Sequence, residues 1–331
     1  MKVIIPVAGA GAKLRPHTYT QPKPLIPLAG KTILSFILDQ FIEQGQKDFI
    51  FIIGYLGEKI RNYVLEHYPD IQATFIVQNE RSGTGHAIYL ARESVGPDEE
   101  LLIVYGDTIC DYDLAAVIQS PYSVVGVKKV DDPRDFGVAE LTPDGFIKNA
   151  VEKPKIPKSN MAMVGIYKIR ESTRLFDVIE KEFIQNKIAE EYHLTQVIHE
   201  LVQQGIQIGT FQVNNWFDCG KKENLLETNA ILLNKVGYAS EEIPFFDNTI
   251  IIHPVSIAIG CQIENSIIGP NVTVGEKAHL KNSIIRDSII GSYSVLDKVV
   301  LENSLIGSDA LICGASQSLN IGDNTEIDLS K

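Results

Sequence analysis

Apolar and polar positions divide the chain into two parts with different periods. Up to about residue 235, short apolar runs alternate with segments whose apolar residues recur at helical spacing. Such alternation predicts an α/β fold of Rossmann-like type, with a mostly parallel sheet and helices on both faces. We expect strands at Val3–Val7, Phe49–Ile53, Ala73–Val77, Leu101–Val104 and Val124–Val127, and helices at Leu34–Gln44, Gly57–Glu66, Gly85–Glu93 and Leu114–Ser120.

The second part of the chain has no helical period and consists mainly of Ile, Val, Gly, Asn and Ser. Its phrase E-N-S-I-I-G at 264–269 returns as K-N-S-I-I-R-D-S-I-I-G at 281–291 and as E-N-S-L-I-G at 302–307. Aliphatic–glycine units that repeat about every six residues predict a short left-handed parallel β-helix, in which each turn stacks its aliphatic residues inside. Asn and Ser suit the tight turns at its corners.

These patterns predict the domain organisation. We expect the α/β domain at 1–235, a linker at 236–248 and the β-helix at 249–331. Strand edges at the ends of a β-helix need protection from unwanted pairing. We therefore expect a homo-oligomer that forms through the β-helix.

Composition and charge exclude several classes of protein. The 331 residues carry a formal net charge of −12, which argues against nucleic-acid binding because that function requires a basic surface. No apolar run reaches about 18 residues, and the N-terminus has the pattern of a strand rather than of a signal peptide, so we expect no membrane association. The cysteines are widely spaced and suit buried thiols in the reducing cytoplasm. They are Cys110, Cys219, Cys261 and Cys313.

A loop of small residues follows the first strand, where ligands of open α/β sheets bind. Its backbone N–H groups could approach a polyphosphate closely, and Lys13, Arg15 and Lys23 bring positive charge to the same place. The loop is not a Walker A motif, because no G-K-[ST] follows four variable residues. It is a poor dinucleotide fingerprint too, because prolines interrupt the long helix that this fingerprint requires.

The phrase A-G-A-G-A-K-L-R-P-H-T, followed by P-K-P-L-I-P-L-A-G-K, resembles the signature loop of the sugar-1-phosphate nucleotidyltransferases, usually G-x-G-T-R-L-x-P-x-T and then P-K. The chain departs from it at Ala12, where Thr is usual, and at Lys13, where the catalytic Arg is usual. The resemblance implies a nucleotidyl transfer that depends on Mg²⁺. It implies that Ala8, Gly9 and Gly11 bind the nucleotide, and that Lys13, Arg15, Lys23 and Lys153 are the catalytic cations.

A second motif, Gln78-Asn79-Glu80-Arg81-Ser82-Gly83-Thr84-Gly85-His86-Ala87, leaves a strand and opens a helix. A glutamine amide offers one donor and one acceptor side by side, which matches the imide edge of uracil or thymine. The motif resembles that of the uridylyl and thymidylyl branches of the family and matches the guanylyl branch less well. This resemblance implies that Gln78, Gly83 and Thr84 hold a pyrimidine base. The alternative is a glycine turn at a helix start, with no ligand.

Two aspartates follow apolar segments and are candidate ligands of a hard cation. Asp107 ends the phrase Tyr105-Gly106-Asp107, and Asp218 lies in Trp216-Phe217-Asp218-Cys219-Gly220, which resembles the W-x-D-x-G phrase of the family. The resemblance implies that Asp107 and Asp218 hold one Mg²⁺ between them. The alternative is that each aspartate caps the helix that follows.

The sugar site is implied by Phe136-Gly137-Val138 and by Val151-Glu152-Lys153-Pro154. The resemblance implies that Gly137 packs against the sugar, that Glu152 accepts hydrogen bonds from the sugar hydroxyls and that Lys153 binds the sugar phosphate. The alternative is that Lys153 is a surface lysine before a proline-rich loop.

The phrase Glu191-Tyr192-His193-Leu194-Thr195 has the pattern of a helix start, which we interpret mainly as capping, with contact between Glu191 or Tyr192 and the sugar as the alternative. We expect His193 and His199 to be ordinary residues of a helix face.

The implied reaction transfers the nucleotidyl group of dTTP or UTP to a sugar-1-phosphate, with glucose-1-phosphate as the first candidate. Two alternatives stay open: a catalytically weak paralogue that binds nucleotide-sugars and regulates a partner, and a mannose-1-phosphate guanylyltransferase. The β-helix is expected to be a scaffold rather than an acyltransferase, because it is short and its only imidazoles are His253 and His279. The sequence leaves open which sugar is used and whether the base is uracil or thymine.

Overall fold

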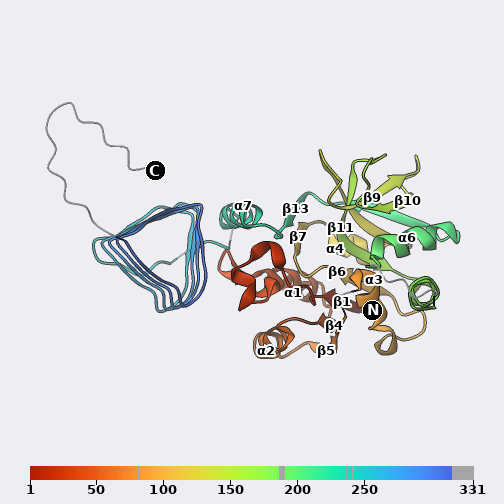
Figure 1. The fold of residues 1–331 in the computed structure, drawn as a ribbon, viewed down its shortest axis with the longest axis horizontal. Helices are drawn as coiled ribbons and strands as arrows, with labels where there is room; N and C mark the ends of the chain where they lie inside the picture. Colours follow the sequence, from red (N-terminus) through yellow and green to blue (C-terminus); the bar gives the residue numbers. More distant parts are fainter. Residues whose placement is uncertain (81, 186–190, 236, 241, 315–331) are drawn as a thin grey trace. The chain divides into compact units, whose positions relative to one another are not determined.

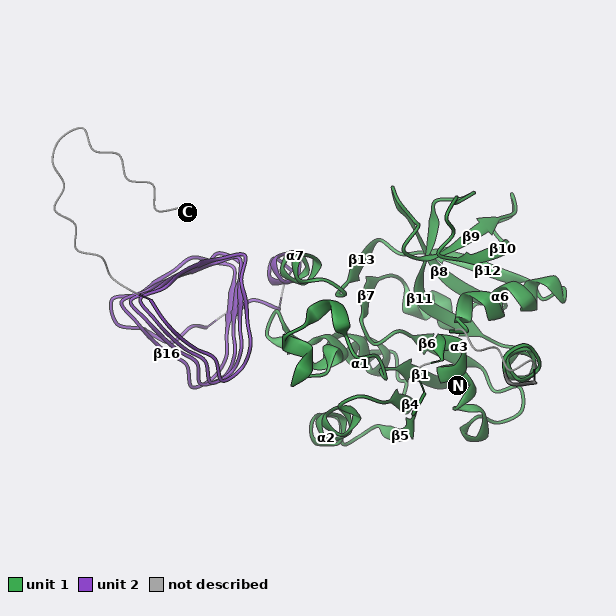
Figure 2. Ribbon diagram, viewed as in Figure 1, with its two compact units in different colours: residues 1–228 green, residues 229–331 purple. Residues whose placement is uncertain are grey.

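The computed structural model describes residues 1–80, 82–185, 191–235, 237–240 and 242–314. The chain forms two compact units, Met1–Thr228 and Asn229–Lys331 (Figure 2). Of the linker and β-helix ranges expected from the sequence, residues 236, 241 and 315–331 lie outside the described residues, as does Arg81 of the Gln78 motif. No helix among the described residues is long and apolar enough to cross a membrane.

Unit 1 contains a nine-stranded sheet with strand order β10-β9-β11-β6-β1-β4-β5, in which β8 pairs with β11 and β12 pairs with β8. Strands β6, β1, β4 and β5 are parallel, whereas β11 runs antiparallel to β6, β8 and β9. The α/β fold class and all the expected strands are confirmed. The strands are β1 (Lys2–Pro6), β4 (Asp48–Ile53), β5 (Gln72–Val77), β6 (Leu101–Val104), β8 (Ser123–Lys129), β9 (Gly137–Leu141), β10 (Ile147–Glu152), β11 (Met161–Ile169) and β12 (Ile208–Gln212).

Helices lie against this sheet (Figure 1), and apolar side chains fill the space between them. Fully buried Ile4, Ile50 and Ile103 of the sheet share one core with Ile88 and Ile198 of two helices. Burial of such side chains is the main source of stability. The helices are α1 (Ile33–Glu43), α2 (Gly57–His67), α3 (Gly83–Tyr89), α4 (Leu114–Gln119), α5 (Ser172–Ile179), α6 (Leu194–Gln203) and α7 (Lys222–Leu233), with 3₁₀ turns at Ala12–Leu14, His17–Tyr19, Lys23–Leu25 and Arg92–Ser94 and a π-helix at Glu180–Gln185.

Two short pairs of strands complete unit 1. One is β7 (Thr108–Asp111) with β13 (Asn215–Asp218), and the other is β2 (Pro27–Leu28) with β3 (Lys31–Thr32). The β7–β13 pair is antiparallel and places Asp218 opposite Thr108. The two aspartates of the sequence analysis therefore come to the same end of this pair.

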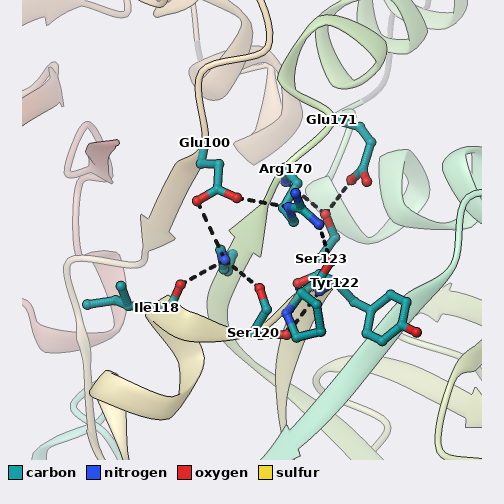
Figure 3. Close-up of polar contacts among 9 residues, drawn as sticks. Glu100, Ile118, Ser120, Tyr122, Ser123, Arg170 and Glu171 are labelled. Carbon is teal, nitrogen blue, oxygen red and sulfur yellow. Dashed lines mark hydrogen bonds and ion pairs between the residues drawn. The ribbon is translucent and has the colours of Figure 1, made fainter.

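A polar cluster surrounds the end of β11 (Figure 3). The Lys168 side chain is 2% exposed, and its Nζ donates hydrogen bonds to the carbonyls of Ile118 (2.8 Å) and Ser120 (2.7 Å). It also lies 3.6 Å from the Glu100 carboxylate. The last carbonyls of a helix have no partner within the helix, so the buried Lys168 side chain supplies donors to the C-terminal end of α4.

The Lys168→Met variant is expected to lower the free energy of unfolding by about 3 kcal/mol, because the carbonyls of Ile118 and Ser120 lose their charged donor. Glu100 keeps its ion pair with Arg170. Denaturation in urea measures this change. Lys129→Met removes an exposed lysine of β8 and should change stability little. Equal losses in the two variants would contradict a structural role for Lys168.

Unit 2 contains three parallel four-stranded sheets, formed by successive coils that Figure 2 shows as triangles. The expected left-handed β-helix fold is confirmed. Ile268, Ile285 and Ile290 point inside and are fully buried, and the corner residues Asn265 and Asn282 have positive φ angles of 48° and 51°. The strands are β14 (Ile250–Ile251), β17 (Ile267–Ile268), β20 (Ile284–Arg286) and β23 (Val300–Glu302); β15 (Val255–Ile257), β18 (Val272–Val274), β21 (Ile289–Ile290) and β24 (Leu305–Ile306); and β16 (Gln262–Glu264), β19 (His279–Lys281), β22 (Val295–Asp297) and β25 (Leu311–Cys313).

The described cysteines are all free thiols. Cys110 and Cys219 are buried, as expected, and burial raises the pKa of the Cys219 thiol to about 12. The expectation of burial is wrong for Cys261, which is half-buried, and for Cys313, which is exposed on β25. Alternate residues of a strand point to opposite faces of a β-helix coil, and Cys313 points outward.

Candidate active site

A cavity of about 510 Å³ lies in unit 1 beyond the carboxyl ends of β1 and β6. The loop after β1, the start of α3 and the end of β13 also form its walls. Parallel α/β sheets bind their ligands at this edge. Most of the residues selected from the sequence line this one cavity: Ala8, Gly9, Gly11, Lys13, Lys23, Gln78, Gly83, Thr84, Asp107 and Asp218.

The loop after β1 is held open by contacts with the 3₁₀ turn that follows it, which contains Thr18. Gly11 has a left-handed φ of 61°, and a Cβ there would lie 2.8 Å from Thr18 Cγ2. The Thr18 hydroxyl donates a 2.8 Å hydrogen bond to the Gly11 carbonyl. At Gly9 a Cβ would meet nothing within 4 Å, so the backbone is open to the cavity. Thr18 was not selected from the sequence, because its contact with Gly11 depends on the fold of the loop.

The cations of this loop differ in their positions. Lys23 Nζ lies 2.6 Å from Asp107 Oδ2, and its side chain is 12% exposed. Lys13 is exposed and lines the cavity. Arg15 is absent from the cavity wall, and its guanidinium carbon lies 5.0 Å from the centre of the Tyr19 ring.

Asp107 and Asp218 form the acidic part of the site. The backbone N–H of Cys219 donates to the Asp107 carbonyl (3.2 Å), which fixes the two segments together. Burial raises the pKa of the Asp218 carboxyl, and the negative charge of Asp107 raises it further, while Lys23 and Lys13 oppose both effects. Two carboxylates under mutual repulsion suit a divalent cation, which would relieve the repulsion and take its other ligands from phosphate or water. The residues that the structure describes include no group of three or more acidic, histidine or cysteine side chains around a common point.

The glutamine and glycine motif forms a turn at the start of α3. Gln78 is 8% exposed, and its amide nitrogen lies 3.3 Å from the Gly83 carbonyl and 3.3 Å from His86 Nδ1. Gly83 has a φ of 92°, and a Cβ there would lie 2.3 Å from the Tyr192 carbonyl oxygen. The turn therefore requires glycine because the backbone of a distant segment packs directly against it.

Tyr105 is a wall residue that was not selected from the sequence. Its hydroxyl donates to Thr84 Oγ1 (3.1 Å) and accepts from the Tyr167 hydroxyl (3.4 Å). Burial raises the pKa of Tyr105 to about 12, so the phenol stays a neutral donor. The available signal was an aromatic residue that directly follows a buried strand and precedes Gly-Asp.

The residues expected to bind the sugar lie together but do not line the cavity. Thr195 Oγ1 donates to Glu152 Oε2 (2.7 Å), and a Cβ at Gly137 would lie 2.4 Å from the same hydroxyl. Lys153 Nζ lies 3.6 Å from the Glu152 carboxylate and lines a second cavity of about 620 Å³ with Arg134 and Lys155.

Glu191 and His193 line the first cavity, and the carboxylate of Glu191 lies 3.5 Å from His193 Nε2. The sequence predicted a helix start here, and His193 does precede α6, where its N–H donates to Gln196 Oε1 (2.7 Å). For Glu191, contact with a substrate was the alternative interpretation. The expectation that His193 is an ordinary residue of a helix face is wrong, because a capping pattern carries no information about which wall the helix start faces.

The nucleotidyl transferase family model matches residues 2–235. The chain is 39% identical over 238 residues to the bifunctional protein GlmU of Methanocaldococcus jannaschii, in a match that covers 71% of this chain but only 55% of that protein. It is 27% identical to the glucose-1-phosphate thymidylyltransferase of Streptomyces antibioticus and 29% identical to a low-salt glycan biosynthesis nucleotidyltransferase of Haloferax volcanii; each match covers 99% of this chain and at least 99% of the relative.

A solved structure from Bacillus anthracis, assigned as a glucose-1-phosphate thymidylyltransferase, has a TM-score of 0.63 at 26% identity and covers 70% of this chain and 94% of its own. The family match spans the whole α/β part of the chain and includes every residue of the cavity wall. The chain therefore belongs to the nucleotidyl transferase family.

Proposed function

We propose that the chain transfers a nucleotidyl group from dTTP or UTP to a sugar-1-phosphate, with glucose-1-phosphate as the first candidate. The observation that carries this proposal is a single cavity that contains a glycine loop with two lysines, a glutamine turn and two aspartates. Phosphate, base and metal each have suitable partners there. The thymidylyltransferase among the relatives supports the choice of glucose-1-phosphate.

In the proposed reaction an oxygen of the sugar phosphate attacks the α-phosphorus of the nucleoside triphosphate in line. The new oxygen–phosphorus bond forms as the bond to the β-phosphate bridging oxygen breaks, and pyrophosphate leaves. The attacking phosphate is already a nucleophile, so the protein acts by positioning and by charge stabilisation. Lys23 is proposed to hold one phosphate and Lys153 the other, while Lys13 is proposed to face the leaving pyrophosphate. Arg15 belongs to the same loop but points to Tyr19 instead of the cavity.

Asp107 and Asp218 are the proposed ligands of Mg²⁺. A bound Mg²⁺ would neutralise charge on the triphosphate. Lys23 Nζ lies 2.6 Å from Asp107 Oδ2, so this lysine neutralises one of the two carboxylates and would hold phosphate beside the ion.

The hydrogen-bonding groups of the Gln78 side chain support the choice of a pyrimidine base. Within the part of the chain that the structure describes, its hydrogen bonds are made by the amide nitrogen. Its carbonyl oxygen can therefore accept a hydrogen bond from an imide N–H, which uracil and thymine both carry. Glu152, oriented by Thr195 and next to Gly137, is the proposed acceptor of sugar hydroxyls.

The test is pyrophosphate release with Mg²⁺, crossing UTP, dTTP and GTP with the 1-phosphates of glucose, N-acetylglucosamine and mannose. Release with a pyrimidine triphosphate and one sugar phosphate supports the proposal and identifies the substrates. Release only with GTP and mannose-1-phosphate would support the guanylyltransferase alternative.

Lys13 favours a second candidate, a regulatory protein that binds nucleotide-sugars. Lysine lacks the planar fork of arginine at a position that faces phosphate, and Arg15 lies over Tyr19. Binding of a nucleotide-sugar without pyrophosphate release from any substrate pair would support this candidate.

We also propose that the β-helix is a scaffold for self-association, and that the protein acts in the cytoplasm, whose reducing conditions suit its free thiols. Ile250, Ile267, Ile284 and Val300 follow one another in register on the outside of one sheet, and Ile250, Ile284 and Val300 are 59%, 44% and 78% exposed. These four residues are here called the apolar column. A β-helix of another copy of this chain carries the same column at the same spacing of about 4.8 Å, so the two columns can pack against each other.

The Ile284→Lys variant is expected to weaken self-association at least roughly tenfold, because it places a charge at the centre of the apolar column. Sedimentation over a range of concentrations measures the association. The control is Val295→Lys, which changes a 39% exposed residue on another sheet of the β-helix. A wild type that stays monomeric, or equal effects of the two variants, would contradict the role of the column.

A further inference from the structure

Residues 191–195, here called the strap, join two parts of the active site that are far apart in the sequence. At one end, the N–H of Tyr192 donates to the Ser82 carbonyl (2.9 Å), and the Tyr192 carbonyl accepts from the N–H of Gly85 (2.8 Å). These backbone bonds fix the strap to the turn that we expect to hold the base. Tyr192 is 3% exposed, so the contact is shielded from water.

A third bond continues along the strap. The N–H of Leu194 donates to Thr84 Oγ1 (3.0 Å), the same oxygen that accepts from the Tyr105 hydroxyl. Tyr105 follows β6 and precedes Asp107 by two residues. Thr84 therefore connects the turn, the strap and the segment that carries an acidic ligand.

The other end of the strap reaches the sugar residues. Thr195 is 3% exposed, and its hydroxyl donates to Glu152 on β10. Gly137 on β9 leaves no room for a Cβ beside the same hydroxyl. A shift of the strap would therefore change the position of the Glu152 carboxylate.

We propose that the strap couples the two substrates, so that a nucleotide bound at the turn prepares the site for the sugar phosphate; this inference rests on the proposed function. Glu191 and His193 of the strap line the first cavity, where we expect the nucleotide to bind. A ligand in this cavity therefore contacts the strap as well as the turn. A base that fixes the turn also fixes the strap and Glu152. The conformational entropy of these residues is then already lost when the sugar phosphate binds, so it no longer opposes that binding. Thr84 and Thr195 act here as positioning residues.

The test measures binding of glucose-1-phosphate by calorimetry, with and without the α,β-imido analogue of UTP or, in a parallel arm, of dTTP. The wild type is expected to bind the sugar phosphate roughly tenfold more tightly when the nucleotide is present, and the nucleotide should gain the same factor from the sugar phosphate. Thr84→Val, which keeps the shape but removes the acceptor of two hydrogen bonds, is expected to bring this factor close to one. Thr84→Ser should restore it.

Thr195→Val tests the other end of the strap and should reduce the same factor. The control is Thr210→Val, because Thr210 on β12 also donates a side-chain hydrogen bond to a carbonyl of unit 1, that of Gly145 (3.1 Å), away from the cavity. A merely structural loss would lower thermal stability in all three valine variants without a selective change in coupling. Binding of both ligands without coupling in the wild type, or unchanged coupling in Thr84→Val and Thr195→Val, would overturn the inference. No binding of either ligand alone would overturn the proposed function and the inference together.

Discussion

The Asp218→Asn variant is expected to lose nucleotidyl transfer by about 10²–10³-fold, as expected when one well-placed electrostatic contact in a transition state is removed. The same change is expected to make the folded protein more stable at neutral pH. Burial and the nearby Asp107 raise the pKa of Asp218 above its ordinary value of 3.8. A raised carboxyl pKa means that stability is lost as pH rises from 3.8 through the folded value, and asparagine removes that loss.

Two measurements check this prediction. Pyrophosphate release reports the activity, and thermal unfolding with and without Mg²⁺ reports the stability and the metal. Mg²⁺ should raise the unfolding temperature of the wild type and leave that of Asp218→Asn almost unchanged, because a ligand stabilises only the state that binds it. The control is Asp113→Asn, because Asp113 caps α4 through a 2.9 Å bond from Ala116 N–H and asparagine is an equally good cap. An active Asp218→Asn variant, or one that Mg²⁺ stabilises like the wild type, would contradict a metal site at Asp107 and Asp218.

The Gly83→Ala variant is expected to lower kcat/KM by about 10²-fold, because a small displacement of a positioning element is enough for such a loss. The new methyl group would lie 2.3 Å from the Tyr192 carbonyl oxygen, so the turn and the strap have to separate. The backbone at Gly83 also has a φ of 92°, which disfavours alanine by itself.

Gly205→Ala separates these two causes. Gly205 has a nearly equal φ of 85°, but a Cβ there meets nothing within 4 Å. This control should lose about 1–2 kcal/mol of stability from backbone strain alone and keep its activity. Urea denaturation and steady-state kinetics of both variants give the comparison. Equal behaviour of the two variants would show that the contact with Tyr192 is not required.

The sequence predicted the parts of the fold and site that depend on local patterns. Apolar runs were enough for β1, β4, β5, β6 and β8, and the repeated E-N-S-I-I-G phrase was enough for the β-helix. Motif spacing identified Lys23, Asp107 and Asp218, and the structure places all three at one cavity. The fold predictions succeeded because strand periodicity is set by neighbouring residues. The three side chains lie at one cavity because loops at the carboxyl ends of the strands share one edge of the sheet.

The remaining features depend on contacts between distant residues, which one sequence does not reveal. The antiparallel pairs of β11 and the bonds of Tyr192 to the 82–85 turn are of this kind. Lys168 gave no signal either, because a lysine in an apolar strand pattern is identified as a partner of the α4 carbonyls only after the chain has folded. Arg15 was predicted from the motif to face phosphate, and its observed position over Tyr19 depends on the three-dimensional course of the loop.

The central claim is tested most directly by the products that the purified chain forms from a pyrimidine nucleoside triphosphate, a sugar-1-phosphate and Mg²⁺. Phosphorus NMR follows the nucleotide-sugar and the pyrophosphate in one sample. We predict that the two products appear in equal amounts, only when both substrates are present, and that Asp107→Asn suppresses both. Release of pyrophosphate without a nucleotide-sugar, or no product from any pyrimidine triphosphate and sugar phosphate, would contradict the proposed nucleotidyl transfer.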